Sequence, residues 1–238
     1  MTAFVSFQGA HRRSIGAALR SEKLREGAAK LGIAGACAFL CLGAVVRFAL
    51  VLDQMPRSID ALNAARLFAI GCQTIFYLLV LWFTLTRRPA LRRATGWQPR
   101  LVAAIGAFSI FAFGFLPPVQ GLGIGWHLAA ALLLLASAAL GAFVLAHLGR
   151  SFSLMSEARG LVTQGPYRFV RHPLYLVEEL AAIAGFIEAM SPAAALLLAV
   201  QIAFQVRRIL NEEAVLEASF PDYVRYKART ARVIPGIW

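Results

Sequence analysis

The segment from residue 160 to residue 175 could bind an anion at the start of a helix. It reads Gly-Leu-Val-Thr-Gln-Gly-Pro-Tyr-Arg-Phe-Val-Arg-His-Pro-Leu-Tyr. Pro173 is suited to the first turn of a helix, which predicts His172 at the N-cap and free backbone N–H groups just after it. Free N–H groups at a helix start can bind an anion, so this segment is a candidate ligand site.

Two arginines and two tyrosines in this segment suit a charged ligand with a flat ring. Arg168 and Arg171 would add cationic donors, and Tyr167 and Tyr175 would add apolar walls with a polar tip. The same residues could instead form a basic anchor with interfacial aromatic side chains, since both residue types are common at membrane interfaces. Spacing alone leaves both interpretations open.

A second charged pair follows in the segment 207–226. Arg208 and Glu212 are four residues apart, so on a helix they share a face. One interpretation is an exposed ion pair, worth at most about 1 kcal/mol. The other is a cation and an anion at the mouth of a membrane cavity, where a charged cofactor could use both.

The elements that must position these residues are helices that cross a membrane. Four apolar blocks are close to the roughly 17 to 25 residues that a span needs, and they run over 31–52, 67–85, 101–116 and 126–148. A further apolar stretch, 174–206, is broken at Ser191-Pro192 and predicts a helical hairpin. We therefore predict an all-α polytopic membrane bundle with four clear spans, a C-terminal helical hairpin, and a cytoplasmic helix and tail.

The basic residues predict how the bundle is oriented. Lys and Arg total 24 against 12 Asp and Glu, and 21 of the 24 fall before residue 31, within 87–100 and 150–171, and from 207 onward. Every second loop is therefore basic, which predicts an integral protein of the inner or cell membrane with both termini in the cytoplasm. Basic loops also suit anionic lipid headgroups, so the charge does not require a nucleic-acid partner.

The sequence lacks the common motifs of other enzyme classes. It has no HExxH, GxSxG or P-loop motif, and its four histidines are scattered. We expect no metal site. We divide the chain into residues 1–148, with the basic segment and four spans, and residues 149–238, with the chemistry-bearing motifs, hairpin and tail.

Taken together, the motifs resemble the isoprenylcysteine carboxyl methyltransferase family, including its bacterial members and the related phospholipid methyltransferases. The resemblance covers about residues 149–238, whereas the N-terminal spans resemble the family only in being spans. The matching pieces are Gly160-Leu-Val, Gly165-Pro-Tyr-Arg, Arg171-His-Pro-Leu-Tyr175, Glu212-Glu213, Tyr223, Tyr226 and Arg232-Val-Ile-Pro235.

The resemblance implies an integral membrane enzyme that transfers a methyl group from S-adenosylmethionine to a lipid or lipidated acceptor. By position, Arg208 would hold the acceptor as the catalytic residue. The cofactor's sulfonium and ammonium groups suit a carboxylate and aromatic faces, and its carboxylate suits a helix start. The residues that would line the cofactor pocket are Arg159, Gly160, Leu161, Val162, Tyr167, His172, Pro173, Leu174, Tyr175 and Glu212.

The sequence leaves three alternatives for the function. A carboxylate of a lipidated or isoprenoid-type acceptor is already nucleophilic, so Arg208 need only orient it. An amine, as in phospholipid N-methylation, needs a base, for which His172 or Glu213 are candidates. The third is a non-catalytic membrane module of the same fold, suggested by Val177, where the family usually has a glycine that allows close backbone approach. The sequence does not determine the oligomeric state.

Overall fold

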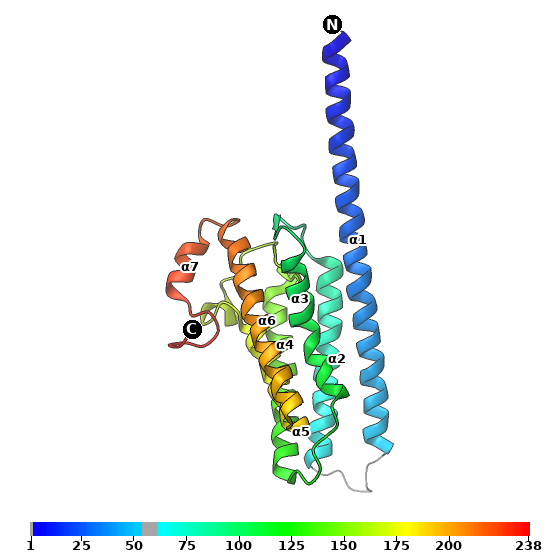
Figure 1. The fold of residues 1–238 in the computed structure, drawn as a ribbon, viewed down its shortest axis with the longest axis vertical. Helices are drawn as coiled ribbons and strands as arrows, with labels where there is room; N and C mark the ends of the chain where they lie inside the picture. The colour runs from blue at the N-terminus through cyan, green and yellow to red at the C-terminus, as the bar shows by residue number, and fades with distance from the viewer. Residues whose placement is uncertain (1, 54–60) are drawn as a thin grey trace.

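The computed structural model describes residues 2–53 and 61–238, with side chains over 24–53 and 62–238. The described chain is almost entirely helical (Figure 1). Its elements are α1 (Thr2–Asp53), α2 (Ala61–Thr86), β1 (Arg92–Arg93), α3 (Gln98–Phe108), η1 (Ser109–Phe115), α4 (Ile124–Leu148), η2 (Gly149–Ser151), β2 (Glu157–Ala158), η3 (Gly165–Arg168), α5 (Pro173–Ala189), α6 (Pro192–Glu217) and α7 (Tyr223–Arg229).

Five helical segments are long and apolar enough to cross a membrane: Leu24–Asp53, Leu62–Thr86, Gln98–Phe115, Ile124–Ser151 and Pro192–Glu217. Large apolar side chains on them, such as Phe39, Phe68 and Phe115, are exposed. Lipid, not water, is the solvent that suits such a surface. The predicted all-α polytopic membrane bundle is confirmed.

The predicted hairpin is formed by α5 and α6, which meet at Ser191. The Ser191 side chain accepts a hydrogen bond from the backbone N–H of Ala194 at 3.2 Å, and Pro192 begins α6. A capping oxygen followed by proline is a strong helix start. Of the two arms, α6 is long and apolar enough to span, whereas α5 carries Glu178, Glu179 and Glu188.

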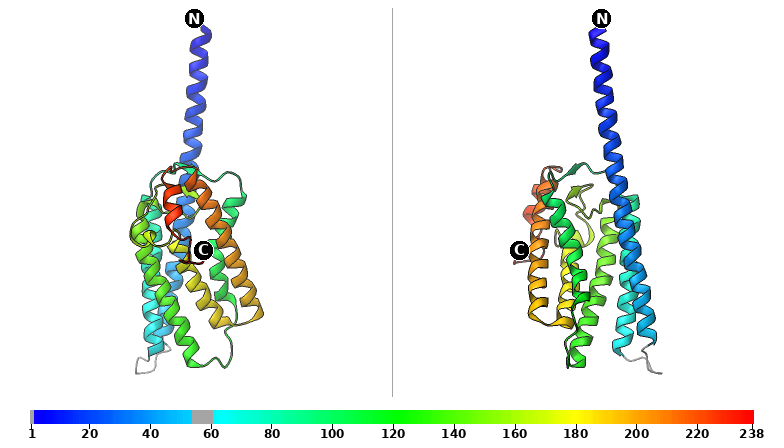
Figure 2. Two further views of the ribbon diagram at one scale, coloured as in Figure 1. Left: turned by 90° about the vertical axis from the view of Figure 1, so that its left-hand side faces the viewer. Right: turned by 45° about the vertical axis from the view of Figure 1, so that its right-hand side comes forward.

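Helices that are neighbours in space are not always neighbours in sequence. α2 packs between α1 and α4, α4 packs on α5, and α3 packs on α6 (Figures 1 and 2). α1 therefore lies at one edge of the bundle, and its N-terminal part projects beyond the other helices. This order places α5 and α6, which carry the motif residues, next to α4 and α3.

The loops rich in arginine gather at the end of the bundle from which α1 projects, here called the basic end (Figure 2). β1 pairs with β2 there, with Arg92 opposite Ala158. The tail is attached to the motif segment, since the N–H groups of Arg171 and His172 donate to the carbonyls of Ala231 and Arg232 at 2.8 and 3.0 Å. Three loops that are distant in sequence thus form one layer. That this layer faces the cytoplasm stays a prediction.

Candidate functional site

The start of α5 has the form predicted from the sequence. Pro173 is its first residue and His172 its N-cap, but the His172 side chain makes no capping hydrogen bond. Its Nε2 lies 3.2 Å from Oε1 of Glu213 instead. The first N–H groups of α5 therefore remain without a side-chain cap, which is the arrangement that an anionic ligand requires.

Glu213 is the centre of a buried charge cluster beside this helix start. It is 4% exposed. It accepts from Nε of Arg171 at 2.9 Å and from Nη2 of Arg232 at 3.0 Å, in addition to the His172 contact. A buried carboxylate is stable when it is paired in this way. The two residues named from the sequence as possible bases, His172 and Glu213, are thus engaged with each other, and Glu213 also with two arginines.

Tyr175, Arg208 and Glu212 come together from α5 and α6. The Tyr175 hydroxyl donates to Oε2 of Glu212 at 2.5 Å. The guanidinium carbon of Arg208 lies 4.7 Å from the centre of the Tyr175 ring, which is cation–π geometry. Arg208 and Glu212 share a helix face as predicted, and Tyr175 links them.

Arg208 is 2% exposed, so it is not part of an exposed ion pair. Its Nη1 donates to Glu178 at 3.1 Å and to Gln205 at 3.3 Å, and its Nη2 donates to the Leu154 carbonyl at 3.2 Å. Its Nε is buried without a hydrogen-bond partner among the described residues. Buried donors in proteins are nearly always satisfied, so this one is a candidate partner for a ligand oxygen.

Glu178 is a site residue that sequence reasoning did not assign. Besides Arg208, it accepts from Nε2 of Gln205 at 2.6 Å. The signal for it was its charge within an apolar segment, because ionisable residues in membrane helices are commonly functional. Which residue it pairs with could not be read from the sequence.

Tyr167 is fixed by the tail and by the core. The Tyr226 hydroxyl donates to the Tyr167 carbonyl at 2.6 Å, and the Tyr167 ring packs with Val162 and Leu174. Burial raises the pKa of Tyr167 well above its usual value and raises that of Tyr226 to about 12. Both phenols therefore stay neutral at physiological pH.

Two glycines let the motif loop lie close to the end of α4. Gly165 has a φ of +59°, and a Cβ there would overlap the His147 ring. A Cβ on Gly160 would come within 2.6 Å of Oγ of Ser151. The positive φ and the ring contact favour glycine at position 165, whereas a side chain at position 160 would require the Ser151 hydroxyl to move. Val162 packs on the core cluster that contains Tyr167 and Leu174, whereas the nearest neighbours of Gly160 are Ser151 and Arg88. That Gly160, Leu161 and Val162 line a cofactor pocket stays a prediction.

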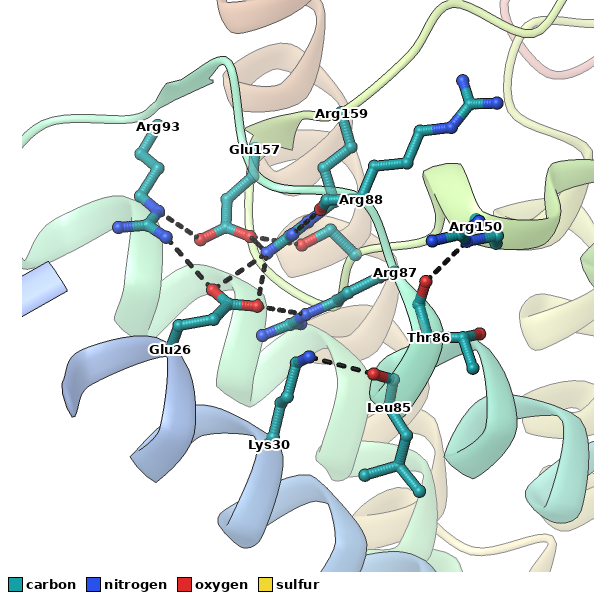
Figure 3. A network of polar contacts seen from close by, with 11 residues as sticks. Glu26, Lys30, Leu85, Thr86, Arg87, Arg88, Arg93, Arg150, Glu157 and Arg159 are labelled. Carbon is teal, nitrogen blue, oxygen red and sulfur yellow. Dashed lines mark hydrogen bonds and ion pairs between the residues drawn. The ribbon is translucent and has the colours of Figure 1, made fainter. Parts of the chain in front are cut away.

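Arg159, predicted to line the cofactor pocket, makes its contacts elsewhere. Its side chain donates to Glu157 at 2.6 Å and to Glu26 of α1 at 3.3 Å (Figure 3). Arg87 and Arg93 also bind Glu26, at 2.7 and 3.0 Å. The structure therefore places Arg159 in an ion network with α1 and not with Tyr175 and Glu212.

A cavity of about 910 Å³ lies between α1, α2, η1, α4 and α5, and most of its lining side chains are apolar. Val177 and Glu178 form part of its wall. Val177 is accommodated because α4 has Gly141 opposite it, and Oγ of Ser137 donates to the Val177 carbonyl at 2.6 Å. Glu178 connects this cavity to Arg208.

The fold and the site define a polytopic membrane protein with a buried, charged cluster next to an apolar cavity. Residues 129–218 match the isoprenylcysteine carboxyl methyltransferase (ICMT) family. The match contains all the predicted site residues and bears out the resemblance over this part of the chain. A comparison with curated proteins found no match.

Proposed function

We propose that this protein is a membrane methyltransferase that uses S-adenosylmethionine to O-methylate a carboxylate on a lipidated or isoprenoid-type acceptor. The observation that carries the proposal is the buried, unpartnered Nε of Arg208, beside the Tyr175–Glu212 pair. The same guanidinium donates to Glu178, which lines the apolar cavity. The match of residues 129–218 to this family supports methyl transfer in a membrane. Tyr175 and Glu212 support the choice of cofactor, and Arg208 supports a carboxylate as the acceptor.

The residues present fit the cofactor. Glu212 offers a carboxylate and Tyr175 an aromatic face to its positive groups, and the uncapped start of α5 offers N–H groups to its carboxylate. Nδ2 of Asn211, one residue before Glu212, is buried without a partner among the described residues. When bound, the cofactor would supply an electrophilic methyl group. The protein's part is to hold both reactants in line.

The acceptor would place its carboxylate at Arg208 and its apolar chain in the cavity. A carboxylate would accept a hydrogen bond from the free Nε–H of Arg208, which orients it without any need for a base. An apolar chain would occupy the 910 Å³ cavity. The site is buried, which strengthens these polar contacts.

The direct test uses the purified protein in lipid nanodiscs with methyl-labelled cofactor and total membrane lipid. We expect label in a lipid fraction that mild base releases, as an ester does. Arg208→Ala should lose this activity, whereas Arg207→Ala, which removes an exposed arginine one position away, should keep it. Absence of any labelled lipid, together with absence of cofactor binding in calorimetry, would contradict the proposal.

Glu178 favours a second candidate, an amine N-methyltransferase. Its carboxylate already pairs with Arg208 at 3.1 Å and lines the cavity, so it could attract an ammonium acceptor and take its proton. His172 and Glu213 are engaged with each other, which leaves Glu178 as the better base. Mass spectrometry separates the two candidates, since N-methylation adds a base-stable methyl group to an amine headgroup.

A further inference from the structure

A pocket of about 390 Å³ lies between α1 and the start of α3 at the basic end. It is separate from the site at Arg208. α1, the β1 segment, the first turn of α3 and the segment before β2 all contribute to it. Its lining residues are Arg25, Glu26, Ala28, Ala29, Arg93, Ala94, Pro99, Arg100, Met155, Ser156 and Glu157.

The charges around this pocket leave a positive surplus. Glu26 and Glu157 are already paired with arginines, as Figure 3 shows for Arg93 and Arg159. Arg25 and Arg100 are exposed and form no ion pair with any side chain that the structure describes. Two unpaired guanidinium groups on one small pocket are a strong recognition site for a phosphate group.

Ser156 gives a second, independent indication of a ligand. Its side chain is 5% exposed, and its Oγ is buried without a hydrogen-bond partner within the described part of the chain. The start of α3 is also nearby, and its N-cap residue, Trp97, makes no side-chain capping bond. A phosphate oxygen would satisfy the buried hydroxyl and lie favourably at this helix start.

The pocket continues into apolar surface on the same two helices. Ala29 of α1 and Arg100 of α3 line it, and Ala36 and Ala107, each seven residues further on, line the larger cavity. Seven residues are two helix turns, so each pair lies on one face, about 10 Å apart along the axis. The two pairs therefore define a seam along α1 and α3 that runs from the charged pocket to the apolar cavity.

The side chains around the pocket are those of a membrane boundary. Trp97, Leu91 and Leu24 are 73%, 68% and 69% exposed. Tryptophan is enriched where headgroups meet the hydrocarbon core. The pocket is thus at headgroup level, and the seam leads from it toward the hydrocarbon.

We propose that this seam binds one anionic phospholipid. Its headgroup phosphate contacts Arg25, Arg100 and Ser156, and its acyl chains follow the seam between α1 and α3. The lipid joins α1, at the edge of the bundle, to α3, which packs against the helix that carries Arg208. This site does not depend on the proposed methyl transfer, because a lipid would stabilise α1 against α3 whatever the acceptor is.

The test measures the thermal stability of the full chain in detergent while phosphatidylglycerol or phosphatidylcholine is added. We expect phosphatidylglycerol to raise Tm at lower concentration. Arg25→Ala/Arg100→Ala should raise the phosphatidylglycerol concentration needed for half of the Tm increase roughly thirtyfold. This factor follows from the usual gain in binding per arginine at an anionic lipid surface. The matched control is Arg207→Ala/Arg225→Ala, which removes two exposed arginines outside the pocket and should respond like the unmodified chain.

Three outcomes would overturn the proposal. One is an equal effect of the two lipids on the unmodified chain. Another is an equal loss in both double variants, which indicates general charge attraction. The third is the same stabilisation by inorganic phosphate or glycerol phosphate, which indicates a soluble ligand. If the pocket variant does not fold, photo-crosslinking of the unmodified chain with a diazirine-bearing phosphatidylglycerol replaces it. We expect crosslinks in residues 24–40 and 98–108. Crosslinks only in other segments would contradict the proposal.

Discussion

Arg208 has three acceptors around it and one buried donor that none of them uses. A buried guanidinium needs a counter-charge, and Glu178 supplies it across the α5–α6 contact. The same carboxylate competes with any acidic acceptor that approaches Arg208. Substitutions at Glu178 can therefore show whether the methyl acceptor is negatively or positively charged.

Glu178→Gln should raise kcat/KM several-fold for a carboxylate acceptor. Glutamine keeps a hydrogen bond to Arg208 but removes the competing negative charge. Initial rates with varied acceptor measure the effect, and Glu217→Gln, at an exposed pair with Lys227, is the matched control. A fall of about a hundredfold or more would instead identify Glu178 as the base for an amine acceptor.

Tyr175→Phe should weaken cofactor binding about tenfold and leave Tm nearly unchanged. The substitution removes the hydrogen bond to Glu212 but keeps the ring beside Arg208. A hydrogen bond to a charged group is worth about 1.5–3 kcal/mol, part of which water can replace. Calorimetry gives Kd and scanning fluorimetry gives Tm. An unchanged Kd with a lower Tm would show that Tyr175 has only a structural role.

Val177→Gly should destabilise the protein and should not increase its activity. Val177 is buried against α4, so glycine leaves a void and adds backbone freedom within a helix, at a cost of about 2–3 kcal/mol. Thermal unfolding and kcat/KM at low temperature measure both effects. A gain in cofactor affinity would indicate that the valine obstructs the site, as the sequence alone suggested.

At the scale of elements, Glu213 attaches α6 to the motif segment and to the tail. Glu213→Gln should lower stability by about 3 kcal/mol, because it leaves buried Arg171 and the nearby Arg232 without their counter-charge. Limited proteolysis should then cut within 218–238. Asp222→Asn, at an exposed pair with Arg225, should not expose this segment. Unchanged protection of the tail in Glu213→Gln would mean that the backbone contacts at Ala231 and Arg232 suffice.

At the scale of the whole molecule, the Glu26 network joins the two regions predicted from the sequence. Glu26 lies within 1–148 and Arg159 within 149–238, and Arg87 and Arg93 bind the same carboxylate (Figure 3). Several arginines share two glutamates there, so the basic end keeps a positive surplus. That surplus suits an anionic leaflet on the cytoplasmic side.

Both termini should therefore face the cytoplasm. Single cysteines placed at Gln120 and at Arg225, in a background without native cysteines, report on the two ends of the bundle. Both positions are exposed, and only Gln120 lies in the loop between η1 and α4, away from the basic end. An impermeant maleimide added to intact spheroplasts should label position 120 and not position 225. The reverse pattern would invert the topology.

The spans, the hairpin break and the motif residues could be predicted from the sequence because each depends on neighbours along the chain. An apolar run of sufficient length must be a helix in lipid, and Ser191-Pro192 starts a new helix through its own capping oxygen and fixed φ. His172 and Pro173 at the start of α5 follow from the same local rules.

The tertiary structure alone decided which charges meet. Glu178 and Arg208 are 30 residues apart and Arg159 and Glu26 are 133 apart, so no spacing rule connects them. Their pairing depends on which helix faces pack together, and that is determined by the whole core. For the same reason, the sequence grouped Arg159 with the cofactor residues, whereas packing places it with α1 and leaves Arg208 with Glu178, Tyr175 and one free donor.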